Sequence, residues 1–165
     1  MQRCSRPISL AMAILLLGGC NPTQGGSSGS IKTYKNQRFG FESIYPGTWR
    51  STPPPSNLDG QTFYHPHNPD IQISVWAGYQ VSPPPTVRDA IPKEDRPTSN
   101  ENFTTRQGLN GDLTVEIGTQ TSTINLTLMA NNISYHFKGR SPSSSFADYY
   151  RLFYDVASQY QIEER

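Results

Sequence analysis

Three runs near the end of the chain constrain the fold more than any other feature. In residues 113–117, 124–130 and 133–138, apolar and polar side chains alternate strictly along the sequence. Strict alternation is typical of a strand with one buried and one exposed face. The runs follow one another closely, so they predict an antiparallel meander and not parallel strands joined by long crossovers.

The last two runs are separated only by Asn131 and Asn132. Asparagine tolerates the left-handed backbone that a two-residue primed turn requires. With that turn, every apolar residue of the hairpin lies on one face, whereas a slip of one residue would divide them between both faces. The predicted pairs are Ala130 with Ile133, Leu128 with Tyr135, and Leu126 with Phe137.

Further strands are expected earlier in the chain. Two short extended pieces flank Gly40, and Pro46 ends the second because proline cannot donate a ladder hydrogen bond. Residues 61–65 form a short strand, and residues 71–77 alternate between an apolar and a polar face. Before the first of these strands, residues 57–60 form a turn in which Gly60 is the residue able to take a positive φ.

A helix is predicted to close the chain. Serines 143–145 offer an N-cap, and Ser145 with Asp148 has the spacing of a capping box. Apolar residues then recur at steps of three and four as one wide stripe, which we expect to cover the sheet. The stripe comprises Phe146, Tyr149, Tyr150, Phe153, Val156, Ala157 and Tyr160.

A second, short helix is predicted over 86–91, after the prolines at 83–85, and it ends before Pro92.

The N-terminus has the pattern of an export signal. Arg3 and Arg6 precede an apolar run over 8–17, which is too short for a spanning helix of about twenty residues. The sequence Leu17-Gly18-Gly19-Cys20 that follows resembles the lipobox of bacterial lipoproteins. This resemblance divides the chain into a signal peptide (1–19), a lipidated cysteine with a flexible Gly/Ser linker (20–30) and one globular domain (31–165).

The lipobox resemblance also implies a location. Bacterial lipoproteins carry acyl chains such as palmitate on this cysteine, so Cys20 is expected to anchor the protein in a membrane. Asn21 replaces the aspartate that usually retains lipoproteins in the inner membrane, which favours the periplasmic side of the outer membrane. A plain signal peptide with an incidental cysteine is the alternative.

Composition excludes other classes of protein. Of the 14 Lys and Arg residues, Arg3 and Arg6 leave with the signal peptide, so the 13 acidic residues give the mature chain a net charge of about −1. A nucleic-acid partner is therefore not expected. The second cysteine, Cys4, also leaves, so no disulfide is expected.

Three stretches together resemble the PsbP-like domain. The first is Tyr34-x-Asn36-x-x-Phe39-Gly40-Phe41-x-x-x-Tyr45-Pro46-x-x-Trp49, the second is the turn at 57–60 with the strands after it, and the third is the ending from Tyr135 to Tyr160. The resemblance implies an α+β fold, in which an antiparallel β-sheet is flanked by helices as an α/β/α sandwich. A second helix layer would then cover Trp76. The relatives are largely binding or assembly accessories, so the resemblance implies a fold and no active site.

Candidate chemistry is sparse. His65 and His67 are two residues apart and could share zinc or copper with Asp70 or His136, although Pro66 and Pro69 favour a turn with two surface histidines. No nucleophile, zinc-protease or phosphate-binding motif appears, so neither enzymatic activity nor a cofactor is expected. Candidate binding-surface residues are Trp76 and Tyr79.

These observations leave three hypotheses for function. The first is a non-catalytic binding or assembly accessory with a protein partner in the cell envelope, which would use a sheet edge or a loop that includes the proline segments. The second is a lipoprotein that binds a metal or a small ligand through the region of His65 and His67. The third is an envelope hydrolase.

Overall fold

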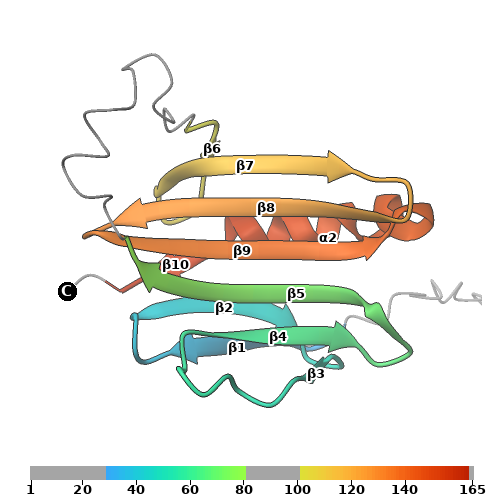
Figure 1. Cartoon of the computed structure of the whole chain (residues 1–165), viewed down its shortest axis with the longest axis horizontal. Coiled ribbons are helices and arrows are strands. Elements are labelled where there is room, and N and C mark those ends of the chain that lie inside the picture. Colours follow the sequence, from blue (N-terminus) through green and yellow to red (C-terminus); the bar gives the residue numbers. More distant parts are fainter. Residues whose placement is uncertain (1–28, 81–100, 164–165) are drawn as a thin grey trace, which may run out of the picture.

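The computed structural model of the chain describes residues 29–80 and 101–163. In these ranges two antiparallel sheets and one α-helix make up the fold (Figure 1). The larger sheet has the order β3 (Arg50–Ser51), β4 (Gly60–His65), β5 (Asn68–Tyr79), β9 (Ile133–Pro142), β8 (Thr121–Ala130), β7 (Asn110–Ile117) and β6 (Phe103–Thr104). The smaller sheet has the order β1 (Ile31–Asn36), β2 (Phe41–Pro46) and β10 (Gln161–Ile162).

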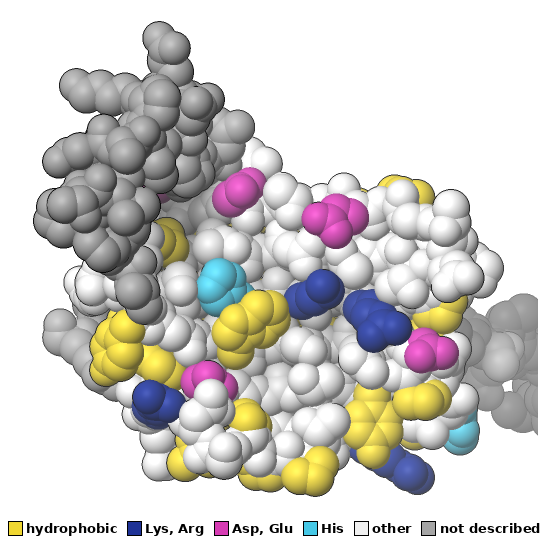
Figure 2. Space-filling model, viewed as in Figure 1, with side chains coloured by type: hydrophobic (Ala, Val, Ile, Leu, Met, Phe, Trp, Pro, Cys, Tyr) yellow, Lys and Arg dark blue, Asp and Glu magenta, His cyan; other side chains and the backbone are white. Residues whose placement is uncertain are grey.

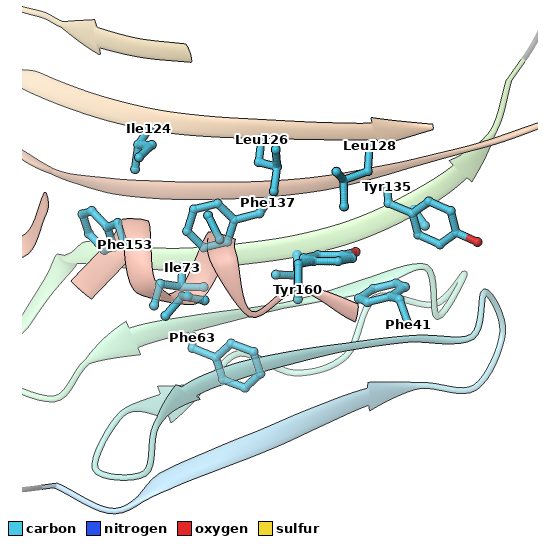
Figure 3. Close-up of a cluster of buried hydrophobic side chains, with 14 of the residues drawn as sticks. Phe41, Phe63, Ile73, Ile124, Leu126, Leu128, Tyr135, Phe137, Phe153 and Tyr160 are labelled. Carbon is cyan, nitrogen blue, oxygen red and sulfur yellow. The ribbon is translucent and has the colours of Figure 1, made fainter. Parts of the chain in front are cut away.

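One face of the larger sheet carries the core. The 3-10 turn η2 (Ser143–Ser145) leads into α2 (Phe146–Ser158), which lies behind β8 and β9, while the smaller sheet lies beside α2 (Figure 1). Side chains from both sheets and α2 meet in one apolar cluster (Figure 3). The aromatic rings of Phe41, Phe137, Phe153 and Tyr160 are almost completely buried there. Burial of such side chains contributes about 1.5–3 kcal/mol each.

The predicted meander is confirmed. Asn131 and Asn132 have φ angles of 51° and 62°, as a primed turn between β8 and β9 requires. All three predicted pairs form: Ala130 with Ile133, Leu128 with Tyr135, and Leu126 with Phe137. The predicted alternation over 71–77 is also confirmed, since Ile71, Ile73, Val75 and Ala77 are buried on β5.

The first two strands flank Gly40 as predicted, and β2 ends at Pro46. Gly40 has a φ of 65°, and its N–H donates to the Asn36 carbonyl at 2.9 Å. The Asn36 side chain accepts the Phe39 N–H at 2.9 Å. The same side chain donates to the Leu58 carbonyl at 3.0 Å, which ties this turn to the loop before β4.

Two local predictions are wrong. In the 57–60 turn the positive φ belongs to Leu58 (54°) and not to Gly60. Gly60 is needed for space, because a Cβ there would lie 2.1 Å from the Val75 carbonyl oxygen. Ser145 does occupy the N-cap, but it makes no capping hydrogen bond and instead donates to the Pro142 carbonyl at 3.2 Å. Its φ and ψ of −116° and 2° differ from the extended conformation that is typical of an N-cap residue.

The antiparallel sheet and one covering helix of the predicted α+β class are confirmed. Tyr160 lies beyond the end of α2, where it is buried against Phe41 and Tyr135. The smaller sheet was not predicted as a separate unit. In the described ranges, no helix has the length and apolar character needed to cross a membrane. The signal peptide, Cys20, the prolines at 83–85 and the helix over 86–91 lie outside the described residues.

Candidate functional site: the open face of the larger sheet

The larger sheet has a second face, opposite the core, that is polar. Figure 2 looks onto this face, where one hydrophobic side chain and one histidine lie side by side near the centre and basic side chains follow. We use the term open face for the residues that the central strands β5 and β9 present there. These are Gln72, Ser74, Trp76, His136, Lys138 and Arg140.

An aromatic pair occupies the middle of the open face. Trp76 of β5 is the cross-strand partner of His136 of β9, and their rings stack with centroids 5.0 Å apart and an interplanar angle of 19°. The Trp76 side chain is 37% exposed, whereas a covering helix predicts a buried one. The pair therefore presents an accessible flat aromatic surface, which suits stacking against a ligand or a partner side chain.

His136 is held neutral near physiological pH. Burial lowers the pKa of its imidazole, because the charged form would lose hydration. Its Nδ1 lies 3.2 Å from the Thr127 hydroxyl on β8, which fixes the ring orientation. The imidazole thus supports the Trp76 ring and adds no positive charge to the face.

Positive charge on the open face comes from Lys138 and Arg140. They lie two residues apart on β9, they are half-buried, and their cross-strand partners on β5 are Ser74 and Gln72. In residues 29–80 and 101–163, neither has a carboxylate within ion-pair distance, and the ion pair present there joins Lys35 to Glu42. Two cations that lack an ion-pair partner in these ranges and lie beside an aromatic surface favour a partner that carries negative charge.

A hollow of about 290 Å³ adjoins the aromatic pair. Pro53 and Pro55, from the loop between β3 and β4, line it together with Trp76 of β5. Thr62 and Ser74 also line it, and their hydroxyls hydrogen-bond each other at 2.9 Å. Asp59 lines the hollow as well, and its carboxylate accepts a hydrogen bond from the Asn57 side chain at 2.6 Å. The hollow is large enough for one flat group with hydrogen-bonding substituents.

The predicted metal residues do not form a cluster. The rings of His65 and His67 lie 5.8 Å apart, and the His67 N–H donates to Nδ1 of His65 at 3.3 Å. The N–H of Asp70 is bonded to the Asn68 side chain at 3.1 Å. His65 contacts Tyr149 of α2, whereas His136 lies on the open face, on the other side of the sheet. In the described ranges, no three His, Cys, Asp or Glu side chains are grouped closely enough to hold a metal ion.

The two predicted binding-surface residues lie on opposite faces. Trp76 belongs to the open face, whereas Tyr79 is on the core side at the end of β5. Tyr79 is 66% exposed and contacts Phe39 edge to face at 5.5 Å. Lys138 and Arg140 were missed. The alternating run already indicated that both lie on the polar face of their strand. Only the pairing of β5 with β9 places them beside Trp76.

Comparisons with known proteins show likeness of structure alone. No protein-family model matches the chain, and no curated protein matches it in sequence. One similar solved structure is cyanobacterial PsbP (CyanoP) from Synechocystis sp. PCC 6803, with 16% identity, a TM-score of 0.46, and coverage of 89% of this chain and 99% of that one. Another is a protein from Bacteroides thetaiotaomicron, with 15% identity and a TM-score of 0.51; it aligns with 81% of this chain, which spans 49% of its length. At such identity the likeness to the Bacteroides protein concerns the fold, and neither comparison indicates a ligand.

Proposed function

We propose that the chain is a non-catalytic binding or assembly accessory of the cell envelope that contacts its partner through the open face. The observation that supports this most is the half-exposed Trp76, stacked on His136 beside the hollow at Pro53 and Pro55. Tryptophan is among the residues that contribute most to binding when it lies in an interface.

The proposal includes the location inferred from the sequence. A lipid on Cys20 anchors the protein, and the Gly/Ser linker lets the domain stand away from the bilayer surface. The side of attachment is the periplasmic face of the outer membrane. The PsbP-like assignment of the domain likewise stays a prediction. It rests on three stretches together: Tyr34 to Trp49, the turn at 57–60 with the strands after it, and Tyr135 to Tyr160.

The arrangement of polar groups supports binding without catalysis. In the part of the chain that the structure describes, no histidine is hydrogen-bonded to a serine hydroxyl or to a carboxylate. The hydroxyls of Thr62 and Ser74 bond each other, and within the described residues neither is hydrogen-bonded to a histidine or to a carboxylate. A catalytic nucleophile needs such a base within hydrogen-bond reach. The partner that best fits the face combines a flat ring, for Trp76, with a carboxylate or phosphate, for Lys138 and Arg140.

Photo-crosslinking in intact cells tests the open face. Benzoylphenylalanine in place of Trp76 is expected to give a discrete adduct with an envelope component. The same group in place of Ile31, which is 56% exposed on β1, serves as the control and is expected to give none. Charge reversal with Lys138→Glu and Arg140→Glu is expected to reduce the adduct at position 76. No adduct at position 76, or the same adducts from both positions, would contradict the proposed site.

The anchor has a separate test. Mass spectrometry of the detergent-extracted protein is expected to find a diacylglyceryl adduct on Cys20 as the first residue. Cys20→Ser is expected to move the protein to the soluble fraction. An unmodified Cys20 in the wild-type protein would refute the anchor while leaving the open face untouched.

A further inference from the structure

The outer edge of β7 is only partly protected. β6 pairs with Asn110 and Gly111 and then ends. The next position, Leu113, is covered by one side chain, since Asn102 accepts the Leu113 N–H at 2.8 Å and donates to the Leu113 carbonyl at 3.0 Å. Both main-chain groups of Leu113 therefore face away from β8, towards the edge.

The main-chain N–H and C=O groups of Val115 and Ile117 face the same edge of β7. In an antiparallel strand the N–H and C=O of one residue point to the same neighbour, and alternate residues point to opposite sides. Within residues 29–80 and 101–163, no strand pairs with β7 beyond Gly111 on this side. An unpaired edge of this kind is a template for another strand.

The side chains around these groups are apolar. Val115 is 43% exposed and Ile117 is 72% exposed, and both point to the side of the sheet that α2 covers. On that side the ring of Tyr154, which is 40% exposed on α2, lies 5.4 Å from Phe103 of β6. Main-chain groups would provide affinity for an added strand, and alternate side chains would provide specificity.

We propose that the edge of β7 at Val115 to Ile117 is a strand-addition site for an extended segment of another protein. This site is separate from the open face and goes beyond the function proposed above. The segment is one with two apolar residues two positions apart and a lysine or arginine between them. The basic residue would face Glu116, which is exposed and lies on the opposite side of β7 from Val115 and Ile117.

The charge of Glu116 argues against a second copy of the chain. If two copies paired Val115 with Ile117, Glu116 would face Glu116 directly, and like charges in that position are destabilising. If Val115 paired with Val115, Ile117 would lie opposite Leu113, whose main-chain groups Asn102 already occupies. If Ile117 paired with Ile117, Val115 would face Thr119, which lies in the bend after β7.

Nuclear magnetic resonance titration of the full mature chain in detergent tests the proposal. The probes are two blocked pentapeptides, Thr-Val-Lys-Val-Thr and Thr-Val-Glu-Val-Thr. The lysine peptide is expected to shift the Val115 and Ile117 amide signals and to bind about fivefold more tightly than the glutamate peptide, the upper range for one cross-strand charge pair. Before any addition, these two amides are expected to exchange with solvent faster than those of Thr114 and Glu116, which face β8.

Two variants make the result decisive. Val115→Pro removes one edge N–H and is expected to abolish the shifts. Glu116→Lys is expected to reverse the preference between the two peptides. This second variant keeps the test valid if the proline variant fails to fold. Trp76→Ala is expected to leave peptide binding unchanged, which separates this site from the open face. An absence of shifts at Val115 and Ile117, or the same peptide preference in Glu116→Lys, would overturn the proposal. A concentration-dependent dimer that buries this edge would overturn the choice of occupant.

Discussion

Replacement of Gly139 by alanine tests how closely α2 packs on β9. Gly139 lies on the core face of β9, directly beneath Phe153 of α2. An added Cβ would lie 2.5 Å from Cγ and 2.8 Å from Cδ1 of Phe153, and 2.9 Å from Cγ2 of Ile124. Both neighbours are completely buried, so neither can swing into solvent. The helix must therefore move away from the sheet, or the two side chains must leave their preferred rotamers.

Two opposing effects determine how much Gly139→Ala changes the free energy of unfolding. Overpacking of a filled core costs about 1–3 kcal/mol. Replacement of glycine by alanine restricts the unfolded chain and returns about 0.4–1 kcal/mol. Gly139→Ala is thus expected to lower the free energy of unfolding by about 1–2 kcal/mol. Gly78→Ala on β5 is the matched control, because an added Cβ there meets nothing within 4 Å, and it is expected to be neutral or slightly stabilising.

Urea denaturation in a Cys20→Ser background, followed by tryptophan fluorescence, measures both variants. With a slope of about 1–3 kcal/mol per molar for a domain of this size, the two midpoints should differ by about 1 M. Phe153→Leu removes ring atoms from the contact, so it should cost less in the Gly139→Ala protein than in the wild type, with a coupling of about 1 kcal/mol. Equal midpoints for the two alanine variants, or no coupling, would refute the close approach of α2 and β9.

Three further results are expected. Burial lowers the pKa of His136, so the unfolded state binds the proton more readily. The free energy of unfolding is therefore highest above the unfolded-state pKa of about 6.5 and declines as pH falls below it. His136→Gln should reduce this decline, as measured by urea titrations at pH 7.5 and 5.5. The buried Tyr160 hydroxyl has no hydrogen-bond partner in the described ranges, so Tyr160→Phe should raise the free energy of unfolding by about 1 kcal/mol. Tyr135→Phe should lower it, because the Tyr135 hydroxyl donates to the Phe39 carbonyl at 3.3 Å; the reverse order would contradict both assignments. Zinc titration calorimetry should give the same weak heat for the wild type and for His65→Ala with His67→Ala, and tighter binding by the wild type would support the metal hypothesis instead.

The parts of the fold that could be predicted are those where neighbouring residues carry two agreeing signals. The hairpin of β8 and β9 combines strict alternation, which excludes a slip of one residue, with a two-asparagine turn, which fixes the register. The turn at Gly40 and the strand end at Pro46 are local in the same sense. Local backbone chemistry decides such features, so one sequence is enough to recognise them.

The missed features depend on contacts between distant segments. β10 was missed because its two residues become a strand only by pairing with Phe41 and Glu42 of β2, far away in the sequence. The role predicted for Gly60 was wrong because the nearby Val75 carbonyl across the sheet, and not the conformation of the turn, requires a glycine there. The stack of Trp76 on His136 was missed for the same reason, since it requires β5 to lie beside β9.

The core register and the open face depend on the same pairing. Val75 faces Phe137 and Ala77 faces Tyr135 in the core, and this register alone sets Trp76 opposite His136 on the other side of the sheet. A slip of one residue would bring basic side chains of β9 into the core, so the buried side chains hold the open face in place. The dependence does not run the other way, because no open-face side chain belongs to the apolar core cluster. Substitutions there should therefore change binding without unfolding the domain, and a loss of crosslinking at position 76 can be attributed to the site itself.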